Sequence, residues 1–256
     1  MHRKLTALSA AVVLLVVLSA PNAVAAEDAW EHSFTFYGWL SGIDGTIGVG
    51  PLDLPVDVTI GDAWSALSDV TRVFMGHYEG TRGRWTIIAD YSNLELQSSA
   101  ATVAGPVTVD LTQRFAELCG TYRLGEGTYE CEKHDLAVLA GLRYAEIGSS
   151  FELPGGAGGS SSQNWIDPII GLTYRTRLSG RWQLGARGDL GGFGLGNGSD
   201  LVSNLLLRFT YSSSDRWLFS SGWRWLDYDY ETGADTSRFV YDVTLSGPFL
   251  GATYAF

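Results

Sequence analysis

Nine charged residues lie at even spacing within otherwise apolar stretches of the chain. They are Asp90, Arg143, Asp167, Arg175, Arg177, Arg187, Asp189, Arg208 and Arg224. Residues two apart in a strand point to the same side, so these side chains are expected to face one shared interior. Charges withdrawn from water need partners of opposite sign. The set therefore predicts a network of arginine–carboxylate ion pairs, which either stiffens that interior or forms a constriction that selects solutes.

The segments that carry these charges alternate between apolar and polar residues. One example is Leu136, Val138, Ala140, Leu142 and Tyr144, which are apolar at a spacing of two. Gly makes up 32 of 256 residues and charged residues only 18%. Glycine at this level weakens helices and is compatible with many short strands. The sequence therefore predicts an all-β fold.

Two sheet architectures fit the alternation: a soluble sandwich or lipocalin-like barrel, and an outer-membrane barrel whose apolar face meets lipid. The polar positions hold Arg and Gly and almost no Lys or Glu, which favours a lumen over a solvated face. Large aromatic residues lie where strands meet short turns or end the chain, as a lipid-interface girdle requires. These interface aromatics are Trp85, Tyr122, Trp182, Trp217, Tyr254 and Phe256.

Residues 1–26 have the features of a cleaved signal peptide. A basic start, an apolar run over 5–20 and small residues at 23–26 are typical of export signals. Removal of Arg3 and Lys4 leaves 15 basic residues against 28 acidic ones, a net charge of −13. Such a chain is not expected to bind nucleic acid. Residues 27–256 are expected to form one outer-membrane domain in a Gram-negative cell envelope.

The periodicity predicts a single antiparallel up-and-down β-barrel of about ten strands, with eight or twelve as alternatives. The expected strands are 33–43, 71–80, 84–97, 107–124, 134–149, 165–178, 181–192, 201–212, 216–229 and 239–256. Arg-Trp follows a short turn at Arg84, Arg181 and Arg216, which marks these turns as periplasmic. The outer connections include 44–70 and 150–164, and a short helix is expected over 61–68 in the first of them. An extra strand pair near 56–60 would raise the count to twelve.

Three segments of the mature chain resemble an uncharacterised family of small outer-membrane β-barrel proteins. They are Trp165 to Arg175, Arg187 to Gly194 and Tyr241 to Pro248. More weakly, the chain is similar to the broad OmpA-like class of small barrels. The resemblance implies the fold and the outer-membrane location. It implies no catalytic residues and no cofactor.

Enzymes on outer-membrane barrels need a nucleophile or activated water beside a base near the outer rim. The mature chain has His32, His77 and His134, all predicted nearer the periplasmic end. We therefore expect no enzyme activity. Acidic residues gather at 44–69 and 227–235, without the spacing of a calcium loop. No dedicated metal site is expected; instead, these loops are expected to contact lipopolysaccharide through divalent cations.

Cys119 and Cys131 lie symmetrically about Gly125, where a turn is predicted, and are candidates for a disulfide in the exported compartment. The last strand is expected to pair with the first near 34–40, and Gly247-Pro248 to form a bulge. The terminal aromatic is expected to be recognised by the barrel-assembly machinery.

Together these features predict a non-enzymatic, porin-like outer-membrane barrel with a structural role or limited passage of small solutes. The alternatives are a surface ligand-binding or adhesion barrel that uses the outer loops, and a lipid-modifying enzyme.

Overall fold

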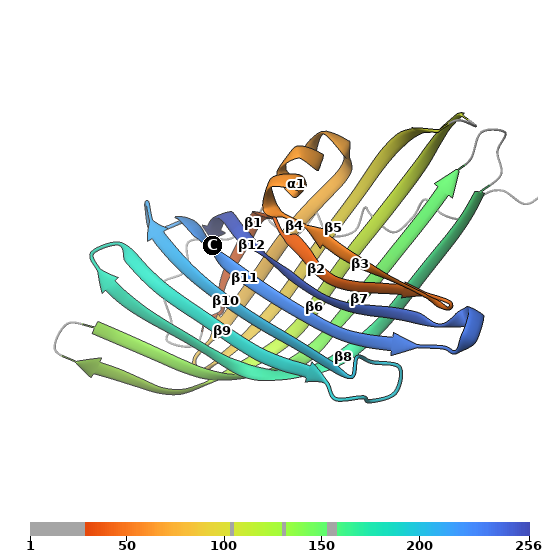
Figure 1. Cartoon of the computed structure of the whole chain (residues 1–256). Coiled ribbons are helices and arrows are strands. Elements are labelled where there is room, and N and C mark those ends of the chain that lie inside the picture. Colours follow the sequence, from red (N-terminus) through yellow and green to blue (C-terminus); the bar gives the residue numbers. More distant parts are fainter. Residues whose placement is uncertain (1–28, 103–104, 130–131, 153–157) are drawn as a thin grey trace, which may run out of the picture.

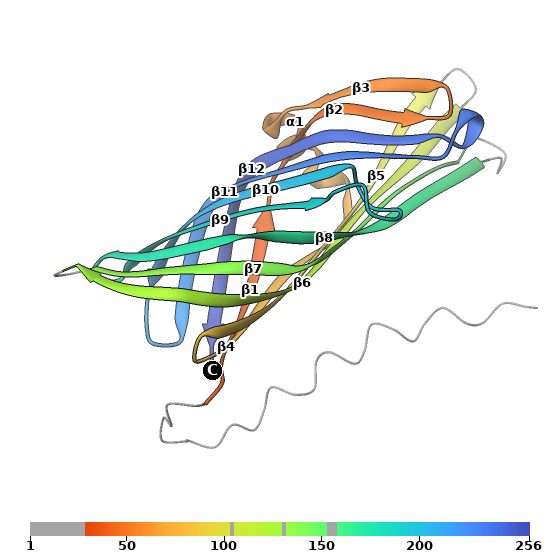
Figure 2. The same ribbon diagram turned by 90° about the horizontal axis from the view of Figure 1, so that it is seen from below.

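The computed structural model describes residues 29–256 except 103–104, 130–131 and 153–157, so the predicted signal peptide lies outside the described residues. Ten antiparallel strands form a closed barrel, with β1 hydrogen-bonded to both β4 and β12 (Figures 1 and 2). They are β1 (Glu31–Trp39), β4 (Val70–Arg82), β5 (Trp85–Thr102), β6 (Gly105–Tyr129), β7 (Glu132–Glu152), β8 (Gly158–Ser179), β9 (Trp182–Gly192), β10 (Leu201–Ser212), β11 (Trp217–Thr232) and β12 (Phe239–Ala255). This confirms the predicted ten-stranded barrel.

Two further strands extend the sheet at its outer end. β2 (Gly42–Val49) continues the line of β1 along β12, and β3 (Leu52–Val58) folds back on β2. β1 pairs with β4 only from Gly76 to Thr81. β2 and β3 therefore add a hairpin to the sheet without entering the closed wall. In the other predicted outer loop, residues 158–164 belong to β8.

The helix predicted in the first outer connection is present as α1 (Ile60–Ser65), followed by the 3₁₀ turn η1 (Ala66–Asp69). Thr59 caps its first turn: the Asp62 amide donates to the Thr59 hydroxyl, and the Asp62 carboxylate accepts from the Thr59 amide. This reciprocal pair satisfies two amides that a helix start leaves open. A second 3₁₀ turn, η2 (Asp235–Ser237), lies between β11 and β12. In the described part of the chain, no helix has the length and apolar character needed to cross a membrane.

Aromatic pairs ring the end of the barrel where the short turns lie, which faces the periplasm in outer-membrane barrels. Trp85 packs against Tyr122 with ring centroids 4.8 Å apart, and Trp217 packs against Tyr254 at 5.2 Å. Trp182 packs against Tyr211, and Tyr254 stacks on Phe256. Trp85, Trp182, Trp217 and Phe256 are all exposed. The structure thus places the predicted interface aromatics in one girdle.

The predicted bulge at Gly247-Pro248 is wrong, whereas the predicted pairing of the last strand with the first is confirmed. β12 keeps one register with β11 from Phe239 to Tyr254, and on its other edge Leu40 N–H donates to the Pro248 carbonyl between the pairings with β1 and β2. The apolar residues of β12 change from the inner to the outer face of the strand for another reason. Val243 and Leu245 fill the interior of the outer half, whereas Leu250 and Tyr254 point outward at membrane depth.

Candidate functional site in the barrel interior

The strand register brings six polar side chains into one row across half of the barrel wall. Each residue pairs with the next on the neighbouring strand, from β1 and β4 through to β8. The row is Thr35, His77, Asp90, Glu117, Arg143 and Asp167. Long-range strand pairing therefore assembles a polar belt that no short sequence motif encodes.

Glu117 lies at the centre of the ion pairs in this belt. Its carboxylate accepts hydrogen bonds from Arg143 Nε at 2.9 Å, Arg187 Nη2 at 2.7 Å and Arg224 Nη2 at 3.0 Å. Asp189 accepts from Arg143 Nη2 and Arg187 Nε, each at 2.7 Å. We call Glu117, Arg143, Arg187, Asp189 and Arg224 the central network. The side chains of Arg143 and Asp189 are 0% exposed, and that of Glu117 is 2% exposed, so these charges are withdrawn from water.

A second polar group lies on the periplasmic side of the central network. His77 contacts Asp90 through Nδ1 at 2.9 Å and Glu79 through Nε2 at 3.1 Å. Arg175 donates to Glu79 at 2.7 Å, and the Tyr37 hydroxyl donates to Asp90 at 2.8 Å. Both ring nitrogens of His77 are thus held by carboxylates inside the barrel.

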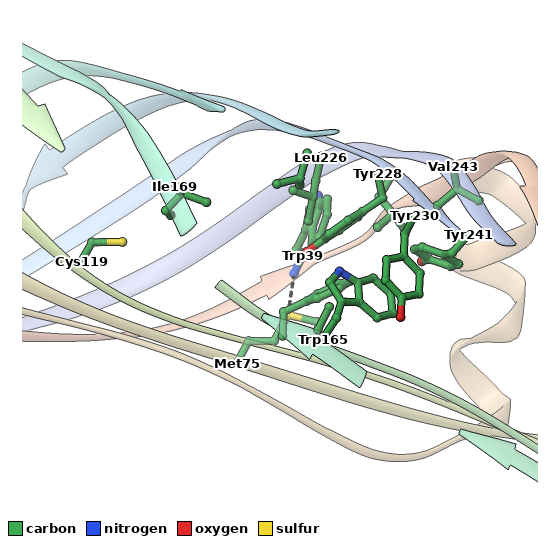
Figure 3. Close-up of a cluster of buried hydrophobic side chains, with 14 of the residues drawn as sticks. Trp39, Met75, Cys119, Trp165, Ile169, Leu226, Tyr228, Tyr230, Tyr241 and Val243 are labelled. Atoms are coloured by element: carbon green, nitrogen blue, oxygen red, sulfur yellow. Dashed lines mark hydrogen bonds between the residues drawn. The ribbon is translucent and has the colours of Figure 1, made fainter. Parts of the chain in front are cut away.

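Aromatic side chains fill the interior on the outer side of the central network. Trp165 stacks on Tyr230 with ring centroids 3.9 Å apart, and Tyr228 and Tyr241 pack around the same indole (Figure 3). We call these four residues the aromatic cluster. Its Trp165 indole N–H donates to Asp167, which also accepts from the backbone and hydroxyl of Ser199. The buried Asp167 carboxylate is therefore satisfied without an arginine.

Eight of the nine charged residues predicted to face the lumen have buried or partly buried side chains. The ninth, Arg177, lies two residues beyond Arg175 on β8 and is exposed near the periplasmic end of the strand. The prediction also missed Glu79 and Glu117, the main carboxylate partners of these arginines. The sequence carries a signal for Glu117, because this residue stands between Phe115 and Cys119 at a spacing of two. The structure buries all three side chains.

The predicted disulfide joins Cys119 to Cys131, and of the two only Cys119 lies in the described part of the chain. Cys119 is a free, buried thiol, and its strand partner is Gly141 on β7. β6 continues past Gly125 to Tyr129, and Gly125 pairs with Leu136 on β7, so Cys119 lies well inside the barrel wall. Cys131 lies outside the described residues.

The two other histidines lie at the periplasmic end. His32 Nδ1 is 2.7 Å from the Tyr78 hydroxyl, and His134 Nδ1 is 2.6 Å from the Tyr174 hydroxyl. Among the described residues, no group of three or more His, Cys, Asp or Glu side chains is arranged to hold a metal ion.

Carboxylates face each other on the outer surface of the sheet. Asp44 lies opposite Asp57 across β2 and β3, and Asp229 lies opposite Asp242 across β11 and β12. Like charges at directly opposed positions destabilise a sheet. We call these four residues the acidic surface.

The fold is similar to that of solved outer-membrane proteins. The outer membrane protease OmpT from Escherichia coli matches with a TM-score of 0.56 and 9% identity, over 92% of this chain and 99% of that one. Ail of Yersinia pestis matches with a TM-score of 0.39 and 11% identity, over 90% and 99% of the two chains. No protein-family model and no curated protein sequence matches the chain.

The closed ten-stranded barrel and its likeness to the OmpT fold show that the chain has the fold of an outer-membrane β-barrel. At 9% identity, the likeness to OmpT shows the fold alone. The aromatic girdle and the outward apolar residues agree with strands that cross a lipid bilayer.

Proposed function

We propose that this protein is a non-enzymatic structural barrel of the outer membrane, whose filled interior prevents the passive passage of solutes. The observation that carries the proposal is the burial of Arg143 between Glu117 and Asp189. A water-filled pore hydrates the charges that line it. In this barrel Arg143 binds two carboxylates out of contact with water, and the aromatic cluster lies on the outer side of this pair of contacts.

Swelling of proteoliposomes tests this proposal. Liposomes that hold the refolded barrel are diluted into isotonic arabinose, with empty liposomes as the negative control and an open porin as the positive control. The proposal expects swelling no faster than in empty liposomes. Rapid swelling would contradict it and would favour a barrel that passes small solutes.

The positions of the histidines support a role without catalysis. His32 and His134 lie at the periplasmic end, and His77 contacts the carboxylates of Asp90 and Glu79. A reaction on lipid or peptide at the outer rim would therefore have no histidine nearby to act as its base. Mass spectra of lipid A from cells with and without the protein test this point, and the two spectra are expected to be identical. A lipid modification that disappears with His77→Ala would contradict it.

A surface-binding role is the second candidate, and one observation favours it. Leu52 and Leu54 on β3 and Trp64 on α1 are all more than half exposed. Large exposed apolar side chains on the outer connections of a barrel are candidates for contact with a ligand. If this candidate is correct, replacing Leu52 and Leu54 by Ser will abolish binding of a surface ligand and leave the barrel folded.

A further inference from the structure

A cavity of about 90 Å³ lies in the barrel interior, on the periplasmic side of the central network. Trp39, Phe249 and Arg224 line it where it meets that network. Arg175 and Arg208, near the periplasmic ends of β8 and β10, line it on the other side. Their side chains are 38% and 26% exposed, so solvent reaches the cavity. Because the outer half is filled, we infer that this access is from the periplasm.

The charged side chains around the cavity carry a positive surplus. Four arginines line it, against three carboxylates: Arg175, Arg187, Arg208 and Arg224 against Glu79, Asp90 and Glu117. The Glu117 carboxylate is already occupied by three guanidinium groups, and Asp90 is held by Tyr37 and His77. The surplus therefore remains on the side of Arg175 and Arg208.

Arg208 is the arginine whose hydrogen-bonding capacity is unused. Within the described part of the chain its guanidinium makes no hydrogen bond, and its nearest carboxylate oxygen, on Glu79, is 3.8 Å away. Charge-assisted hydrogen bonds are about 2.7–2.9 Å long, so this contact is an ion pair without a hydrogen bond. A guanidinium inside a barrel keeps its charge and is stabilised by an acceptor to which it can donate two parallel hydrogen bonds.

The strand register leaves an open position between the two arginines. Gly185 on β9 pairs with Arg175 on one side and with Arg208 on the other. Glycine has no side chain to fill the space between them, and a Cβ built there would be 3.7 Å from Arg208 Nε. Thr35 and Ser220 are among the other polar residues that line the cavity.

We propose that this cavity binds a free small oxyanion from the periplasm, such as a carboxylate, phosphate or sulfate, between Arg208 and Arg175. The anion supplies the acceptor that Arg208 lacks and neutralises the positive surplus. A neutral solute would leave the positive surplus uncompensated, and that surplus repels a cation.

Isothermal titration of the refolded full barrel with sodium phosphate, and separately with sodium acetate, at constant ionic strength, tests the proposal. Wild type is expected to show saturable binding, and Arg208→Gln to weaken it at least about tenfold, because the charge-assisted pair is lost. Arg177→Gln is the matched control: this arginine is exposed near the same end and does not line the cavity. It is expected to bind like wild type.

A second variant keeps the test decisive if Arg208→Gln does not fold. Gly185→Asp places a carboxylate between Arg175 and Arg208, so it is expected to fold and to abolish anion binding by occupying the site. Heat-modifiable gel mobility verifies that each variant folds. Absence of saturable binding of either anion to wild type at millimolar concentration would overturn the proposal. So would an equal loss in Arg177→Gln, or unchanged binding in folded Gly185→Asp.

Discussion

Replacing Glu117 by Gln removes the carboxylate on which three arginines converge. The substitution keeps the shape of the side chain, takes away its charge and turns one acceptor oxygen into an NH₂ donor. That donor then faces guanidinium groups 2.7–3.0 Å from the former carboxylate oxygens. The variant thus isolates the electrostatic contribution of one residue to the central network.

The expected cost follows from how each arginine can respond. Arg143 is 0% exposed and cannot regain water, although Asp189 still binds it. Arg187 and Arg224 are 13% and 8% exposed, so water compensates them in part. The loss should therefore match that of one broken buried ion pair, about 3–5 kcal/mol, rather than three times that amount.

Urea unfolding in lipid vesicles, followed by tryptophan fluorescence, measures this loss. With a urea slope of about 2 kcal/mol per M, the unfolding midpoint of Glu117→Gln should fall by about 2 M. Glu95→Gln is the matched control, since Glu95 binds Arg72 and Arg114 outside the lumen and is 20% exposed. It should cost less than about 1 kcal/mol. Equal losses in the two variants would refute the claim that the central network stabilises the barrel.

Three further predictions address other parts of the chain. Deletion of residues 254–256 should leave export intact but prevent membrane insertion, because it removes the aromatic end of β12. Fractionation should find the truncated chain in the periplasm. A protease-resistant barrel in the outer membrane would contradict this prediction. Asp242→Asn should stabilise the barrel by about 0.2–1 kcal/mol in EDTA, because it relieves repulsion from Asp229. The gain should be smaller when Mg²⁺ is added. Unchanged unfolding midpoints would contradict this prediction. The amide and hydroxyl of Thr59 donate to Asp62 and lower the pKa of its carboxyl group. An NMR titration of Thr59→Ala should therefore show the pKa of Asp62 raised towards its ordinary value. An unchanged pKa would count against the capping geometry.

The strands could be predicted from the sequence because one face of each strand meets lipid and the other a polar lumen. The Arg-Trp pairs at Arg84, Arg181 and Arg216 then located three of the periplasmic turns, since tryptophan prefers the membrane interface. The same reasoning failed in β12. There the outer half packs a protein core inside, as with Val243 and Leu245, so the apolar set changes sides without any change of register.

The partners within the lumen could not be predicted, because they depend on register between strands distant in sequence. Glu117 and Arg224 are 107 residues apart and meet across the barrel interior. The alternating sequence pattern predicted the arginines of the lumen, but it did not predict their carboxylate partners Glu117 and Glu79. The turn predicted at Gly125 was wrong for a related reason: β6 continues to Tyr129, and Cys119 pairs with Gly141 on β7, so the assumed symmetry about Gly125 is absent.

Single-channel recording of the wild-type barrel in a planar bilayer tests the filled interior most directly. Small ions are more demanding probes than sugars, because they report any continuous path of water past Arg143. A filled interior predicts a bilayer current indistinguishable from that of protein-free membranes while the barrel remains folded and inserted. Reproducible conductance steps that scale with the number of inserted barrels would contradict it.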